Sequence, residues 1–337
     1  AIQSYGDENN RTSIENNTVI TGSKTYGIIA TYADILNNTV SGGGNDKSII
    51  VGQTYHHGNG NYFNTVGGDA VISENNIYGM VHGIYSDNAD IQVLNNTIET
   101  TSGWAIKVIG EDGSSIIKNN LLETTSGRGF EVEEQTEVEF INNTIVGTES
   151  ADYAIHISNY STPVVRNNII QGFQNGIYAE NNFANYNISY NDLWQISNSL
   201  FEGTAMPALI GEIISQNLNG DPSDIYYNIS MDPLYIDGEN ADYNLQSDSP
   251  CINAGDPDTD RDGITWVTDV DDQDPDGTRK DMGAYPYNLD IQPVNSIEIT
   301  SPGYRLFSSP VSGIIYGDLL EELWTQGSAG SDQPSNA

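Results

Sequence analysis

The sequence predicts an all-β fold, a right-handed parallel β-helix solenoid of about eight rungs with an irregular C-terminal capping region. The first observation behind this prediction is an Asn pair that recurs through the first 200 residues with a period of about 23 residues and one longer interval of 38. The second is that short runs of alternating apolar and polar residues flank the pairs. Alternation with period two indicates strands, and runs of four or five residues are too short for helices.

Each repeat unit within residues 1–200 is expected to contain two or three short strands. A step such as Gly83-Ile84 opens the unit, a short apolar run precedes the Asn pair, and an aliphatic residue follows it. Aliphatic residues three positions before and two positions after the second Asn are expected to stack inside the solenoid. Only the unit of Asn76 departs from both columns, with Ser73 and Tyr78. The column of second Asn residues comprises Asn17, Asn38, Asn76, Asn96, Asn120, Asn143, Asn168 and the weaker Asn191.

The Asn pair is expected at a corner of the solenoid. Asn tolerates the left-handed backbone conformation that a tight corner requires. Strands of successive rungs stack about 4.8 Å apart, so amides of one column can hydrogen-bond from rung to rung. We therefore expect an Asn ladder that belongs to the scaffold.

Beyond the repeats we expect a capping and closing region at residues 201–295 and the truncated start of a further module at 296–337. Ala1 falls on the first position of a rung. An uncapped solenoid end would expose apolar rungs and strand edges. We therefore expect a missing N-terminal segment that carries a cap and any signal peptide.

The charge of the chain excludes several partners. It has 11 Lys and Arg against 47 Asp and Glu, a formal net charge of −36. Nucleic acids and anionic membranes require a basic surface, so neither is an expected partner. No apolar stretch approaches the ~20 residues that would span a bilayer, which excludes membrane insertion. The single cysteine, Cys251, forms no internal disulfide and is expected to pack as a small apolar residue.

The repeated pattern Gly-Ile followed by Ile-x-Asn-Asn-Thr-Ile resembles the secreted right-handed parallel β-helix repeat proteins of the pectate-lyase-like superfamily. The resemblance covers about residues 1–200, and segments 231–234, 248–256 and 281–285 resemble the closing region of bacterial members. It implies an exported protein, secreted or at the cell surface, monomeric within a larger multi-domain chain. It is specific for fold and unspecific for activity.

One parallel sheet is expected to carry an outward column of side chains that the resemblance implies faces a polysaccharide. Aromatic rings stack on sugars, and acids and amides bond hydroxyl groups. The residues two positions beyond each Gly or Ala step form this column: Tyr85, Lys107, Glu131, His156 and Tyr178. Two positions further along are Asp87, Glu133, Ser158 and Glu180.

Catalysis on this surface is left open. A polysaccharide lyase would need a base, for which Lys107 and His156 are weak candidates, and an electrophile such as calcium or Arg. A glycosidase would need two carboxylates, and Glu131 and Glu133 at i and i+2 would lie ~6.6 Å apart, at the lower limit for inverting enzymes. The alternative is a solvated sheet face in a non-catalytic structural or adhesive module of a large cell-surface protein.

The long interval contains an insertion at about residues 52–68, with Tyr55, His56 and His57. Loops of this length on a regular scaffold are often functional. The insertion is expected to wall one edge of the outward column; a metal site at the two histidines and a plain insertion are the alternatives.

An acidic loop after the repeats matches the EF-hand calcium pattern. With Asp258 as position 1, carboxylates follow at Asp260, Asp262 and Asp269, and Ile264 offers its carbonyl at position 7. We expect a structural Ca²⁺ here, with a second acidic turn at 271–277 adding ligands. The alternative is a solvated acidic turn.

Overall fold

The computed structural model describes residues 2–22, 26–43, 47–52, 68–110, 114–134, 137–158, 161–180, 187–204 and 206–287, and the backbone of 56–57 and 61–62. Contacts divide the chain into residues 1–290 and 291–337. The predicted further module at 296–337 lies outside the described residues.

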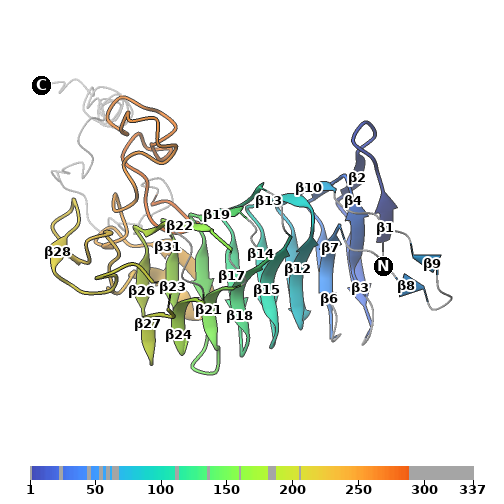
Figure 1. Ribbon diagram of the computed structural model, residues 1–337, viewed down its shortest axis with the longest axis horizontal. Helices are drawn as coiled ribbons and strands as arrows, with labels where there is room; N and C mark the ends of the chain where they lie inside the picture. Colours follow the sequence, from blue (N-terminus) through green and yellow to red (C-terminus); the bar gives the residue numbers. More distant parts are fainter. Residues whose placement is uncertain are drawn as a thin grey trace, which may run out of the picture. The chain divides into compact units, whose positions relative to one another are not determined.

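The described strands form a parallel β-solenoid of about seven turns (Figure 1). Each turn contributes one strand to each of three sheets, and all strand pairs within these sheets are parallel. This confirms the all-β solenoid that the repeat predicts. A short 3-10 helix, η1 (Gly238–Asn240), is the helical element among the described residues, and none there is long and apolar enough to cross a membrane.

The sheets follow one another in chain order. Sheet 1 consists of β1 (Ile2–Tyr5), β4 (Ile28–Thr31), β7 (Lys47–Val51), β12 (His82–Asp87), β15 (Trp104–Ile109), β18 (Arg128–Glu133), β21 (Tyr153–Ile157), β24 (Asn175–Ala179) and β27 (Ser199–Glu202). Sheet 2 consists of β2 (Thr12–Glu15), β5 (Ala33–Leu36), β10 (Asp69–Ser73), β13 (Asp90–Leu94), β16 (Ser114–Lys118), β19 (Glu137–Ile141), β22 (Val164–Arg166) and β25 (Asn187–Ser189). Sheet 3 consists of β3 (Thr18–Thr21), β6 (Thr39–Gly42), β11 (Asn76–Met80), β14 (Thr97–Thr100), β17 (Leu121–Thr124), β20 (Thr144–Val146), β23 (Ile169–Gln171) and β26 (Asp192–Trp194).

A single apolar core runs along the solenoid axis. Strand pairing aligns equal positions of neighbouring rungs, so the aliphatic columns of the sequence become internal stacks. In sheet 1, for example, Ile84 pairs with Ile106, which pairs with Phe130. Their side chains are fully buried, as the alternation predicts.

The corner between sheets 2 and 3 uses the two Asn residues of a pair for different tasks. The residue in first position has the left-handed conformation, with φ between 51° and 58° at eight corners, where Glu74 and Tyr190 stand in place of Asn at two. The second residue points its side chain inward and forms the ladder. Each ladder Nδ2 donates to the Oδ1 of the next ladder Asn at 2.9–3.1 Å, and each backbone N–H donates to the same oxygen.

The ladder corrects the alignment of the third unit. Its member there is Asn75, not Asn76, because Nδ2 of Asn38 donates to Oδ1 of Asn75. Glu74 takes the left-handed corner with φ 57°, and Asn76 is the first residue of β11. Counting from Asn75 restores both apolar columns with buried Ile72 and Ile77.

The ladder also continues beyond the last repeat that the sequence reveals. Asn191 donates to Asn228, 37 residues further along the chain. Asn228 in turn donates from Nδ2 to Oδ2 of Asp224 at 3.0 Å. Asp224 is fully buried, and its carboxylate also accepts the N–H groups of Gly211, Tyr226 and Asn228. A carboxylate therefore terminates the amide column.

The closing region has two roles in the structure. Residues near the end of the solenoid, including Phe201 and Met206, pack against the end of the core. The rest, with the hairpins β28 (Ser215–Gln216) to β29 (Pro222–Ser223) and β30 (Tyr235–Asp237) to β31 (Asp242–Leu245), folds back along the last rungs. Ile169 of β23 packs with Cys251 and Met282 in a second apolar cluster.

Two corner residues are anchors for this region. Nδ2 of Asn142 donates to the carbonyl of Asp281 at 2.9 Å, and Oδ1 of Asn167 accepts the N–H of Asp256 at 2.8 Å. Cys251 is buried in the second apolar cluster, as expected for a lone thiol that packs, and its thiol donates to Asp192 at 3.4 Å.

Candidate functional site

Strand pairing aligns the predicted outward column of sheet 1. Tyr85 lies opposite Lys107, Lys107 opposite Glu131, Glu131 opposite His156, and His156 opposite Tyr178. Neighbouring positions in these strands point into the core, so the five side chains share the outer face. The column therefore exists as a geometric feature, and its chemistry changes along the sheet.

The N-terminal part of this face is apolar. Tyr85 clusters with Ile29 and Ile50, and with the partly buried Trp104 and Ile109. The Nζ of Lys47 lies 3.5 Å from the centre of the Tyr85 ring, and the Tyr85 hydroxyl donates to Asp87 at 3.4 Å. Tyr85 is only 8% exposed, so its ring offers little stacking surface.

The middle of the face is a network of charges. Lys107 bonds Glu131 at 2.7 Å and Glu133 at 2.9 Å. Arg128 bonds the other oxygen of Glu131 at 2.8 Å and approaches Asp152 at 3.7 Å. Glu131 is nearly buried, so this network is held in place rather than freely solvated.

The network separates the acidities of the two carboxyl groups. Burial raises the pKa of Glu131, but hydrogen bonds from Glu133 and Lys107 and the charges of Lys107 and Arg128 outweigh it and lower the pKa to about 2. Burial and the hydrogen bond with Glu131 raise the pKa of Glu133. Because both groups bond one ammonium and each other, they lack the ~6.5 Å separation that leaves room for water in inverting glycosidases.

Lys107 is a poor base in this arrangement. Burial lowers its pKa, but its hydrogen bonds with Glu131 and Glu133 outweigh burial, and the net pKa is raised. An ammonium held between two carboxylates stays protonated and has no free electron pair to accept a proton.

The C-terminal part of the face is aromatic. His156 and Tyr178 stack with ring centres 5.0 Å apart and planes 11° apart. Tyr153 lies 5.2 Å from Tyr178 and donates its hydroxyl to Glu202 at 3.3 Å. Burial, and then the charge of Arg128, lower the pKa of His156. Its Nδ1 is buried and has no hydrogen-bond partner in the described part of the chain.

A hollow of about 200 Å³ lies beside the charged network of this face. Trp104, Arg128, Glu131 and Asp152 line it, together with backbone of the neighbouring turns. Sequence reasoning missed Trp104, Arg128, Asp152 and Tyr153. A signal existed, because Trp104, Arg128 and Tyr153 each immediately precede a Gly or Ala step, and Trp104 pairs with Arg128.

The remaining predicted surface residues lie at the margins. Asp87 bonds the Tyr85 hydroxyl, Glu180 is exposed, and Ser158 is buried. In the insertion, β8 (His56–His57) pairs with β9 (Asn61–Tyr62) as a small antiparallel hairpin (Figure 1). Tyr55 lies outside the described residues.

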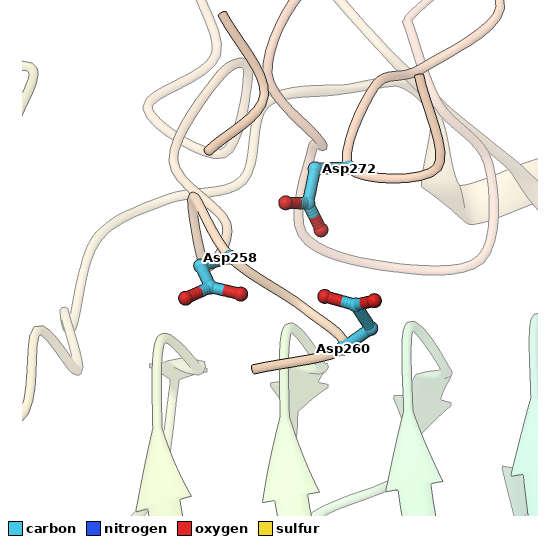
Figure 2. Close-up of side chains that lie close together, drawn as sticks. All are labelled: Asp258, Asp260 and Asp272. Atoms are coloured by element: carbon cyan, nitrogen blue, oxygen red, sulfur yellow. The ribbon is translucent and has the colours of Figure 1, made fainter. Parts of the chain in front are cut away.

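The acidic loop groups a different set of carboxylates from the EF-hand pattern. Asp258, Asp260 and Asp272 each offer an oxygen, and these oxygens lie within 4.8 Å of one another (Figure 2). Asp272 comes from the second acidic turn. Three other predicted ligands lie outside this group: Asp262 accepts the N–H of Ile264, Asp269 hydrogen-bonds Asp271, and Ile264 is 48% exposed.

Comparisons with known proteins found no family model, no curated protein and no solved structure that matches this chain.

Proposed function

We propose that this chain is an extracellular carbohydrate-binding β-helix and that the outer face of sheet 1, from Trp104 to Tyr178, contacts a polysaccharide. The observation that carries the proposal is the hollow of about 200 Å³ lined by Trp104, Arg128, Glu131 and Asp152, on a sheet that also carries the stacked rings of His156 and Tyr178. Ligand sites combine apolar or aromatic walls with a few fixed polar groups. Here Arg128, Glu131 and Asp152 are the fixed polar groups.

Binding is better supported than turnover. Glu131, Glu133 and Lys107 are engaged with one another, so none is free to transfer a proton. Lyase or glycosidase activity on acidic polysaccharide would depend on His156 as the base. The lowered pKa of His156 keeps its ring neutral at neutral pH and able to accept a proton. A reducing-sugar assay with wild type and His156→Ala tests this; turnover that His156→Ala leaves unchanged contradicts the role of His156.

The binding proposal is tested with immobilised acidic and neutral polysaccharides. Trp104→Ala and Tyr178→Ala should each weaken binding by about tenfold or more, which is about 1.4 kcal/mol. The matched control is Tyr78→Ala, since Tyr78 is 42% exposed on β11 in sheet 3, away from the proposed surface. Equal losses in all three variants, or no binding by the intact protein, would overturn the proposal.

The second candidate is a non-catalytic structural or adhesive module of a large cell-surface protein. One observation favours it: the charged side chains of this face pair with one another and so balance their charges without a ligand. These side chains are Lys107, Arg128, Glu131, Glu133 and Asp152. This candidate predicts no glycan binding and no turnover. Its extracellular location is tested by labelling intact cells that make the whole protein with an antibody against the solenoid.

A further inference from the structure

Three carboxylates of the closing region face one another across a small space (Figure 2). Asp258 and Asp260 come from the first acidic loop, and Asp272 comes from the second acidic turn. Because like charges repel, three carboxylates at this separation raise the free energy of the fold unless a cation neutralises them.

Two oxygens of the group are buried without a partner. Asp272 is fully buried; its Oδ1 accepts the N–H of Thr259 at 2.6 Å and the Thr259 hydroxyl, while its Oδ2 has no hydrogen-bond partner in the described chain. The Oδ1 of Asp258 is likewise buried without a partner there. An unpaired buried carboxylate oxygen is costly, and a missing ion is one of its standard explanations.

The neighbouring cations are engaged elsewhere. The Nη1 of Arg166 and the Nη2 of Arg261 both bond Oδ2 of Asp256, at 2.8 and 3.1 Å. Among the described residues, no ion pair reaches Asp258, Asp260 or Asp272. The charge of the group is therefore not balanced by the protein side chains around it.

We propose that Asp258, Asp260 and Asp272 bind a divalent cation, and that the ion is calcium. All donors are oxygens, which suits hard cations and excludes the sulfur and imidazole sites of zinc. Calcium binds oxygen at ~2.4 Å, so two ligands on opposite sides of one ion lie ~4.8 Å apart. The three oxygens lie within 4.8 Å of one another, which fits that sphere, with water completing the coordination.

The ion joins two segments rather than closing one loop. In the EF-hand pattern, Asp262 and Asp269 would complete the site; here Asp262 is bonded to the N–H of Ile264, and Asp272 replaces them from outside the loop. Thr259, which bonds Asp272, also accepts from Arg166 of β22 through its carbonyl at 2.9 Å. Calcium therefore holds both acidic turns against sheet 2.

The test is calcium titration of the full chain after dialysis against a chelator. Wild type should show one saturable site, and its melting temperature should rise as calcium exceeds the dissociation constant. Asp272→Asn should weaken calcium binding at least about tenfold because it removes one ligand charge without changing shape. The matched controls Asp262→Asn and Asp269→Asn should change affinity by less than about twofold.

Asp260→Asn gives a second reading if Asp272→Asn does not fold, because Asp260 is exposed and is not needed for packing. It should also weaken calcium binding about tenfold. The absence of a saturable site in wild type overturns the proposal. A loss in Asp262→Asn as large as in Asp272→Asn overturns the assigned ligand set and favours the EF-hand pattern. Neither result bears on the glycan surface of sheet 1.

Discussion

The solenoid and its closing region satisfy their buried polar groups in opposite ways. In the solenoid one residue type solves the same problem in every turn, and Asn120, Asn143 and Asn168 make equivalent bonds. In the closing region each of three buried carboxylates has its own solution: Asp224 caps the ladder, Asp256 binds two arginines, and Asp272 accepts the N–H and hydroxyl of Thr259. Repetition makes the first region readable from sequence, whereas the second depends on contacts between distant residues.

The largest expected effect comes from removing one ladder member. Asn143→Ala deletes an acceptor for two donors of Asn120 and a donor to Ile117, Ile141 and Asn168. Because the backbone groups it leaves are buried, we expect a loss of about 3–5 kcal/mol in the free energy of unfolding. Urea denaturation followed by circular dichroism measures it. A loss no greater than that of Asn17→Ala, at the more exposed end, would show that ladder position does not matter.

An intermediate effect is expected where the two regions meet, at Asp192. Its carboxylate accepts the N–H of Met231 at 3.0 Å and the Cys251 thiol at 3.4 Å. Burial raises the pKa of Asp192 to about 7, well above the ordinary range of an Asp carboxyl. The folded state thus binds a proton more tightly than the unfolded state. The stability that this proton contributes is fully present below pH ~4 and is lost as pH rises through about 7, by up to about 4 kcal/mol.

The measurement is the difference in unfolding free energy between wild type and Asp192→Asn from pH 4 to 8. The variant should lack this component of the pH dependence, so the difference should change across that window. Parallel curves for the two proteins would rule out Asp192 as the titrating group.

The smallest effect is expected at the irregular corner of the third unit. Glu74 has φ 57°, a conformation in which a non-glycine residue is strained and Asn is better tolerated. Glu74→Asn should stabilise the protein by about 0.5–1 kcal/mol, since it gives this turn the corner residue of its neighbours. Thermal unfolding measures the gain. Asn95→Glu, the reverse change at an exposed regular corner, should lose a similar amount; stabilisation there would contradict the account.

The sequence predicted rungs of two or three strands, the internal columns and the outward column, because a fixed period determines which positions stack. It misplaced the third unit because an Asn pair can occupy two alternative sets of positions. The two residues can be the corner residue and the ladder residue, or the ladder residue and the first residue of the next strand. Only the apolar columns of Ile72 and Ile77 distinguish these two alignments. It missed Asn228 because 37 residues separate it from Asn191. It expected ligands from the second acidic turn, which contains Asp272, but a motif confined to one loop could not single out that residue.

The direction of the ladder bonds gives the solenoid an electrical polarity. Every ladder amide from Asn17 to Asn191 donates to the next ladder residue, and each from Asn38 onward accepts from the preceding one. The amide dipoles therefore add head to tail along the axis, as peptide dipoles add in an α-helix, and aligned bonds polarise one another. Partial positive charge accumulates at Asn228, where the negative charge of Asp224 meets it.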